Sequence, residues 1–123
     1  MILVDTSAWI RFINPKYRAP ENAQLRTWIE SGEAALCEMV CLELQSANPA
    51  ENKMVELLRH TLPRLDHTEG VWNLAGELAR ASRKRGKPVP NSDILIFATA
   101  RYHECTLFHD DKHYNWLAEI ELP

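Results

Sequence analysis

Four acidic residues occupy positions where the side chains of an α/β fold come together. Asp5 and Asp111 each follow a short apolar run that is typical of a buried strand. Glu43 lies one or two turns into a predicted helix, and Asp93 opens the most apolar helical segment of the chain. Because groups just beyond the carboxyl ends of parallel strands converge on one crevice, we expect the four carboxylates to meet there. Carboxylates held together repel each other, and bound Mg²⁺, or Mn²⁺ in its place, would offset that repulsion.

Each of these acids also has a purely structural interpretation. Asp5 would cap the helix that follows it, and Asp93 would offset the dipole at the start of its helix. Glu43 would pair with a buried arginine, and Asp111 would belong to a turn. The occurrence of all four at strand ends or in the early turns of helices favours a shared metal site over four separate structural roles.

Short strand-like runs alternate with helical patterns, which predicts an α/β fold with a mostly parallel sheet. Strands are predicted at 2–4, 34–37 and 106–108, with shorter candidates at 64–66 and 119–121. Helices are predicted at 6–12, 20–31, 39–46, 68–85 and 92–102, from 48 to about 58, and around residue 114. The first helix is expected to stop before Pro15 and the third before Pro49. The chain has 123 residues, 46% of them hydrophobic, and we expect residues 1–123 to form one domain around one core.

The overall charge does not favour binding to nucleic acid through bulk electrostatics. The formal net charge is -3, so such binding would need a local basic patch or metal ions at the acidic site. The sequence has neither a signal-peptide pattern nor an apolar run long enough to cross a bilayer. Its three cysteines are an odd number, which fits a reducing compartment better than a disulfide framework. We therefore expect a cytoplasmic protein that does not enter membranes.

The four acids lie in four blocks of sequence, which are Ile2–Ile10, Cys41–Leu44, Arg85–Ala100 and Leu107–Tyr114. Together these blocks resemble the PIN-domain nucleases, and within them the VapC-type toxins of bacterial toxin–antitoxin modules. In the last block the family places its acid two residues after a Thr or His, which selects Asp111 over Asp110. His113 stands where many relatives carry a further Asp, so the chain departs from the family pattern there.

The resemblance implies a three-layer α/β/α sandwich and an endoribonuclease that hydrolyses RNA phosphodiesters with Mg²⁺-activated water. Asp5, Glu43 and Asp93 would frame the first metal ion. Asp111 would complete a second site or hold metal through water. The resemblance also implies a homodimer and a cognate antitoxin that lies across the acidic pocket. The helices from Ala19 to Val55 are candidate surfaces for both contacts.

Three neighbouring residues are predicted to support the acids. Thr6 and Ser7 would cap the first helix and orient Asp5. Their alternative role is capping alone. Asn91 would form a hydrogen bond near the pocket.

The densest basic cluster supplies the candidate RNA contacts, Arg83, Arg85 and Lys87. The alternative is that these cations only stabilise the end of a helix. The four tryptophans are expected in core or interface packing, with base stacking as the alternative. The sequence leaves open which RNA is cleaved, whether an antitoxin exists, and whether one or two metal ions bind.

Other functions use the same residue types. A receiver domain would need a phosphoacceptor Asp after its third strand and a Lys after its fifth, and the chain does not reproduce that order. An aspartate-nucleophile phosphatase would need a second Asp where Ser7 stands. A PIN-domain RNA-processing nuclease outside any toxin locus and a catalytically silent PIN scaffold remain as alternatives. The scaffold would be indicated by loss of one of the four acids, and all four are present.

Overall fold

A short parallel sheet lies at the centre of the protein. The computed structural model describes residues 1–14, 16–17, 19–47 and 52–122. In these residues three strands form one sheet in the order β2-β1-β3, namely β1 (Ile2–Val4), β2 (Ala34–Ala35) and β3 (Thr106–Phe108). Leu3 of the middle strand is paired with Ala35 on one side and Leu107 on the other, and both pairings are parallel. The prediction of an α/β fold is confirmed, and the described sheet is wholly rather than mostly parallel.

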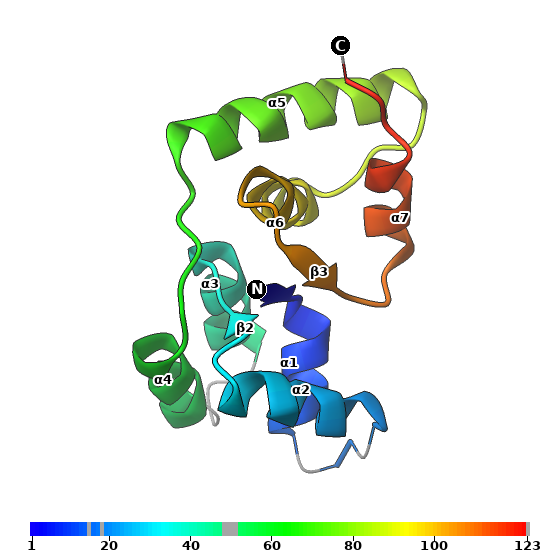
Figure 1. The fold of residues 1–123 in the computed structure, drawn as a ribbon. Coiled ribbons are helices and arrows are strands. Elements are labelled where there is room, and N and C mark those ends of the chain that lie inside the picture. Colours follow the sequence, from blue (N-terminus) through cyan, green and yellow to red (C-terminus); the bar gives the residue numbers. More distant parts are fainter. Residues whose placement is uncertain (15, 18, 48–51, 123) are drawn as a thin grey trace.

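The described residues form seven helices around this sheet. They are α1 (Thr6–Ile13), α2 (Glu21–Glu30), α3 (Glu38–Ala47), α4 (Asn52–Thr61), α5 (Glu69–Lys84), α6 (Asn91–Tyr102) and α7 (Lys112–Ala118). In Figure 1, α2 lies on one side of the sheet and α6, with α5 across it, lies on the other. Helices, sheet and helices therefore form three layers, as the sequence predicts. Among the described helices, none is both long enough and apolar enough to span a membrane.

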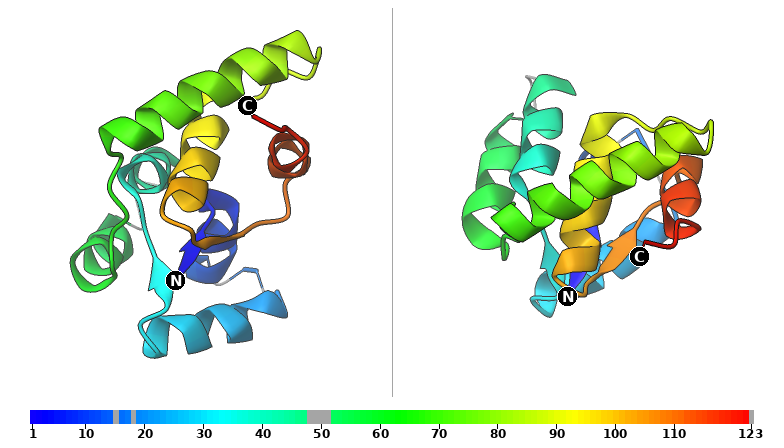
Figure 2. Two further views of the ribbon diagram at one scale, coloured as in Figure 1. Left: turned by 45° about the horizontal axis from the view of Figure 1, so that its top comes forward. Right: turned by 90° about the horizontal axis from the view of Figure 1, so that it is seen from above.

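The strand that Asp5 follows and the helix that carries Asp93 are both largely buried. Leu3 and Val4 of β1 have no exposed surface, which matches a strand covered on both faces. In α6, Ile96 and Ala98 are fully buried, and the helix is enclosed by its neighbours in both views of Figure 2. A helix that is apolar all round must lie inside the fold, and α6 does so. The acids at the ends of these two elements are therefore held by the rigid core.

The predicted helix ends agree with the structure to within a few residues. Thr68 caps α5, since its Oγ1 accepts a hydrogen bond from the backbone N–H of Val71 at 3.3 Å. Gly86, with a φ of 73°, follows the end of α5 in the left-handed conformation that glycine adopts most easily. The predicted helix start at residue 48 lies outside the described residues, as do Pro15 and Pro49.

Two of the shorter predicted strands are wrong. The segment 119–121 is a turn followed by irregular chain, and 64–66 contributes only a single bridge between Arg64 and Leu36. An apolar residue between two acids fits an edge strand, but it equally fits a loop that is anchored by one side chain. Ile120 is such an anchor, with 7% of its surface exposed.

Candidate active site

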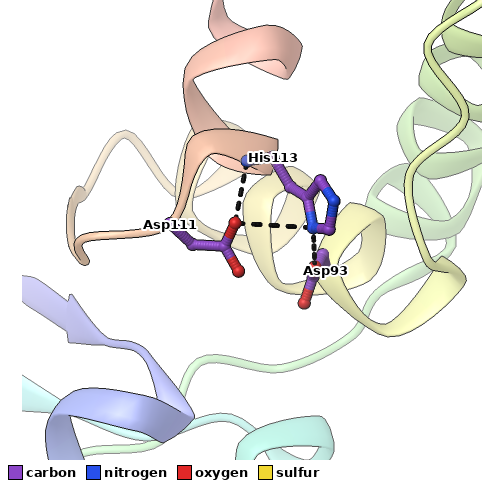
Figure 3. Close-up of side chains that lie close together, drawn as sticks. All are labelled: Asp93, Asp111 and His113. Carbon is purple, nitrogen blue, oxygen red and sulfur yellow. Dashed lines mark hydrogen bonds and ion pairs between the residues drawn. The ribbon is translucent and has the colours of Figure 1, made fainter.

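Two carboxylates and an imidazole meet between α6 and α7. One potential ligand atom from each of Asp93, Asp111 and His113 lies within 4.8 Å of the others. The Nδ1 of His113 is 3.0 Å from Oδ2 of Asp93 and 3.4 Å from Oδ1 of Asp111 (Figure 3). The backbone N–H of His113 also donates to Oδ1 of Asp111 at 2.8 Å. The three side chains thus form one compact group of possible metal ligands.

Local sequence explains how the helices present this group. Asp93 lies in the first turn of α6, directly before the apolar residues that bury the helix. Asp111 is the N-cap of α7, and its side chain accepts the backbone N–H of His113. Asp111 therefore caps a helix, whereas its structural interpretation was a turn residue. The same bond directs its carboxylate toward His113 and Asp93.

Asp5 reaches the same region from the end of β1. It occupies the N-cap position of α1, yet its side chain makes no capping hydrogen bond. Its Oδ1 accepts a 2.6 Å hydrogen bond from the Tyr114 hydroxyl, which lies 3.5 Å from Oδ1 of Asp93. Its Oδ2 accepts a hydrogen bond from Ser7 Oγ at 2.9 Å. Capping therefore does not account for Asp5, whose carboxylate is only 4% exposed and is held between two neutral donors.

Glu43 comes from α3 and is tied to α1. Thr6 Oγ1 donates to Oε1 of Glu43 at 2.6 Å, which joins two helices that lie 37 residues apart in the sequence. The ion pairs of the described residues include none with Glu43, so the alternative of a buried arginine partner finds no support among these residues. Thr6 orients Glu43 rather than Asp5, and only Ser7 has the role that was predicted for both.

The pKa values show that the four acids interact electrostatically. Burial raises the pKa of Glu43, the hydrogen bond from Thr6 opposes this, and the charges of Asp93 and Asp5 raise the pKa further. Burial also raises the pKa of Asp93. The hydrogen bond from His113 lowers it, and the charges of Asp111 and Asp5 raise it. Each of the four carboxylates therefore belongs to one mutually repelling set.

The chemistry of this donor set fits a divalent cation. Among the ion pairs of the described residues, no lysine or arginine contacts Asp5, Glu43, Asp93 or Asp111, and His113 is the only basic partner. Partly buried carboxylates without a cationic partner are costly unless an ion binds them. Oxygen-rich donor sets of this kind suit Mg²⁺ and Mn²⁺.

Tyr114 and His113 are site residues that the prediction from sequence did not include. Tyr114 is 1% exposed, and burial beside Asp5 raises its pKa, so the phenol remains a neutral donor. Its spacing was an available signal, because a residue three positions after Asp111 lies on the same helix face. His113 replaces the acid of many relatives and contributes a nitrogen to the group instead.

The hydrogen bonds and ion pairs of the described residues join none of the other predicted residues to the four acids. Asn91 is exposed and lines a mostly apolar cavity of about 450 Å³ together with Trp72, and the hydrogen bonds of the described residues join its side chain to none of the acids. Arg85 pairs with Glu119 at 3.1 Å, and Arg83 is exposed near the end of α5. The third predicted RNA contact, Lys87, lies over the ring of Trp116 on α7.

Comparisons with known proteins agree with this geometry. The PIN domain family model matches residues 2–120. The VapC ribonuclease Mb1587 of Mycobacterium bovis is 31% identical to this chain, and the match covers 98% of this chain and 93% of that protein. Ribonuclease VapC11 of Mycobacterium tuberculosis matches with the same identity and coverage.

Solved structures of similar fold come from other bacteria. VapBC2 from Rickettsia felis, bound to a DNA fragment from its promoter, has a TM-score of 0.74 and 21% identity, and the match covers 90% of this chain and 88% of that one. FitAcB from Neisseria gonorrhoeae has a TM-score of 0.69 and 21% identity, with 98% and 94% covered. The family match over nearly the whole sequence confirms the resemblance, and the chain belongs to the PIN-domain family, in the branch that includes the VapC ribonucleases.

Proposed function

We propose that this protein is a metal-dependent endoribonuclease and the toxin of a VapBC-type pair. The observation that carries the proposal is the group of Asp93, Asp111 and His113, to which Tyr114 links Asp5 and electrostatic repulsion couples Glu43, with no lysine or arginine partner among the ion pairs of the described residues. The relatives that are 31% identical over 98% of the chain are named as ribonucleases, which supports RNA as the substrate.

In this proposal Asp5, Glu43, Asp93 and Asp111 hold Mg²⁺, with Mn²⁺ as a substitute. Bound Mg²⁺ would supply a more acidic water and would polarise the phosphoryl oxygens of RNA. Carboxylates suit these ions better than imidazole does. We therefore assign His113 to holding Asp93 and Asp111 by hydrogen bonds rather than to direct ligation.

The surrounding side chains fix the carboxylates before any metal arrives. Tyr114 and Ser7 each hold one oxygen of Asp5, and Thr6 holds one oxygen of Glu43. Such supporting hydrogen bonds typically change metal affinity or activity by about 10–100-fold. The donors from Tyr114, Ser7 and Thr6 are all neutral hydroxyl groups. They orient the carboxylates without neutralising them, so the carboxylates keep the negative charge that binds a cation.

A protein partner is part of the same proposal. The solved structures of similar fold include a VapBC assembly from Rickettsia felis and one from Salmonella typhimurium, both bound to DNA, which supports a cognate antitoxin for this chain. A homodimer stays a prediction. Both contacts need exposed apolar surface, and Leu42, Leu57 and Trp72 are 57%, 56% and 55% exposed. Of the exposed large apolar side chains, Leu42 and Met54 lie within the range from Ala19 to Val55.

The test is an RNA cleavage assay with added Mg²⁺ on purified wild-type protein and on Asp5→Asn and Asp93→Asn. We expect each substitution to reduce the cleavage rate by at least about 100-fold, the upper end of the effect of losing a supporting group. Asp110→Asn is the matched control, because Asp110 is next to Asp111 in sequence but pairs with Arg11 at 3.2 Å. Wild-type protein that binds Mg²⁺ without cleaving RNA would indicate the silent scaffold instead. Full activity in either variant would disprove the site assignment.

A further inference from the structure

Two lysine ammonium groups lie at the ring of one tryptophan on α7. Lys87 Nζ is 5.5 Å from the centroid of the Trp116 ring, and Lys112 Nζ is 5.4 Å from it. Lys87 comes from the segment before α6 and Lys112 is the first residue of α7, so the ring brings together two separate parts of the chain. A cation within about 6 Å of an aromatic centroid is attracted to the ring. The Trp116 ring is therefore contacted by two cationic side chains from separate segments of the chain.

These charges have no acidic partner among the ion pairs of the described residues. Those pairs are made by histidines and by Arg11, Arg59, Arg64 and Arg85. Both Lys87 and Lys112 are exposed. Arg85 lies near the same tryptophan, but its charge is already matched by Glu119. The two lysines are thus the cations at this surface that remain available to an anionic ligand.

The two lysines lie near the group formed by Asp93, Asp111 and His113, which is called the acid cluster below. The centroid of the Trp116 ring is 5.4 Å from that of His113, whose Nδ1 contacts Asp93 and Asp111. Lys112 immediately follows Asp111 in the sequence. His113 and Trp116 of α7 therefore link the candidate metal ligands to the two lysines.

An RNA strand needs such an arrangement at this site. The chain has a net charge of -3, and the acid cluster repels phosphate wherever a bound cation does not cover it. Proteins that bind single strands track the backbone with a positively charged groove. Metal would cover only the scissile phosphate, so the adjoining part of the backbone needs other cations.

We propose that Lys87 and Lys112, held by Trp116, form a subsite that binds the RNA backbone phosphate next to the scissile one. This subsite rests on the proposed nuclease function. It predicts the path of the RNA strand, which would run from the acid cluster across α7. The ammonium groups donate charge-assisted hydrogen bonds to phosphate oxygens. The tryptophan positions the two cations, whose place at the ring limits stacking of a base.

The first experiment measures binding separately from cleavage. A fluorescein-labelled single-stranded oligoribonucleotide is titrated with the protein in Ca²⁺ without Mg²⁺, over a series of salt concentrations. We expect Lys87→Ala/Lys112→Ala to weaken binding on the order of tenfold at low salt. The slope of log K against log salt should fall in magnitude by about 0.7 for each phosphate contact removed. The double variant Lys16→Ala/Lys53→Ala is the matched control, because it removes two other exposed lysines and the same net charge.

Two variants of Trp116 test whether its ring positions the lysines. Trp116→Leu keeps both lysines but removes the ring, so we expect weaker binding than in the wild type. Trp116→Phe keeps an aromatic face and should recover most of the affinity. Circular dichroism and thermal melting of each variant show whether the protein keeps its overall fold. A folded Trp116→Leu protein with wild-type affinity would disprove the positioning role of the ring.

The outcomes separate this subsite from the nuclease itself. If the wild type cleaves RNA and Lys87→Ala/Lys112→Ala matches the control pair in affinity, salt slope and KM, the subsite is wrong and the nuclease stands. If the wild type binds RNA through the lysines but does not cleave it, the lysines bind RNA phosphate, but the nuclease and the place of the subsite beside a scissile bond are both wrong. The expected result is a raised KM with a nearly unchanged kcat, because the lysines contact the strand beside the scissile bond.

Discussion

The hydroxyl of Tyr114 donates a 2.6 Å hydrogen bond to Oδ1 of Asp5, and the two residues are 109 positions apart in the sequence. This bond fastens the last described helix to the end of the first strand. The same hydroxyl is 3.5 Å from Oδ1 of Asp93, so one phenol oxygen stands between the carboxylates of two candidate metal ligands. The buried side chain of Tyr114 is therefore part of the site as well as of the core.

Replacing Tyr114 with Phe should separate these two roles, since the ring stays and only the hydroxyl is lost. We expect RNA cleavage to fall by about 10–100-fold and the Mg²⁺ concentration for half-maximal activity to rise, because Asp5 loses a donor that orients it. Metal-free protein should also lose about 1.5–3 kcal/mol of unfolding free energy, the usual value of a hydrogen bond to a charged group. Cleavage assays across a Mg²⁺ series and urea unfolding in EDTA measure both effects. An unchanged Mg²⁺ dependence would show that the hydroxyl only supports packing.

Glu43 predicts a pH dependence of stability in the absence of metal. Its pKa in the folded protein is raised above 4.5 by burial first and by the charges of Asp93 and Asp5 after that. The folded state then holds its proton more tightly than the unfolded state, so ionisation of Glu43 costs stability as the pH rises from about 4.5 through the raised value. Glu43→Gln stays neutral, keeps an oxygen that can accept from Thr6, and should gain stability relative to the wild type over that range.

Urea unfolding in EDTA between pH 4 and pH 8 tests this difference. Adding Mg²⁺ at pH 8 should reverse the order, because the wild type binds the ion and Glu43→Gln binds it less well. Thr6→Val is the companion variant, and it removes the hydrogen bond that favours the ionised form of Glu43. A difference between wild type and Glu43→Gln that stays constant with pH would contradict the raised pKa.

His67 predicts a second and opposite pH dependence. Its Nε2 accepts the backbone N–H of Met39 at 3.1 Å, so Nδ1 carries the proton and donates to Thr99 Oγ1 at 2.9 Å. The neutral ring thereby joins α3, which carries Glu43, to α6. Burial lowers the pKa of His67 below 6.5, against the charges of Glu38 and Asp66, while His103 lowers it further. A lowered pKa contributes stability that is present above pH 6.5 and is lost as the pH falls through the lower value.

We expect the stability advantage of the wild type over His67→Phe to shrink as the pH falls below about 6.5. Guanidinium unfolding at pH 7.5, 6.5 and 5.5 measures it. His60→Phe is the control, since His60 is on the exposed side of α4 and its side chain is 71% exposed. An advantage that is equal at all three pH values would mean that His67 does not act as a neutral link.

Replacing His113 with the Asp that many relatives carry there should make the stability of the protein depend more strongly on metal. His113→Asp removes a hydrogen-bond donor to Asp93 and adds a third carboxylate beside Asp93 and Asp111. We expect a lower melting temperature without metal, owing to the added repulsion, and a larger rise in melting temperature on adding Mg²⁺ than in the wild type. Thermal melts with and without Mg²⁺ give both values. Asn115→Asp adds the same charge to α7 at an exposed position, and it should leave the Mg²⁺-induced rise near that of the wild type.

The features that could be predicted from the sequence are those that depend on one short segment. The run Ile2–Val4 followed by Asp5, and the apolar helix opened by Asp93, each combine a buried element with an acid at its end. Because the strand and the helix are buried, their ends determine the positions of Asp5 and Asp93. The parallel sheet, the main helices and the approach of Asp93 to Asp111 could therefore be predicted, while a metal site shared by all four acids stays a prediction.

Contacts between distant segments could not be predicted in the same way. Thr6 was expected to orient Asp5, its neighbour in sequence, but it donates to Glu43, which only the packing of α1 against α3 brings close. Arg85 was expected to contact RNA, but Glu119, which approaches through the fold, already pairs with it. The segment 119–121 was expected to form a strand, but its pattern of one apolar residue between two acids also fits a loop anchored by Ile120.

The link between Asp5 and Tyr114 has a consequence for synthesis of the protein on the ribosome. A nascent chain that has emerged only as far as α6 lacks Asp111, His113 and Tyr114, and Asp5 then has no phenol to orient it. The acids of the N-terminal half can fold early but cannot form the complete centre before α7 emerges. On the proposed site assignment, the centre is complete only after residue 114 has left the ribosome, and prematurely terminated products that end before α7 should not cleave RNA.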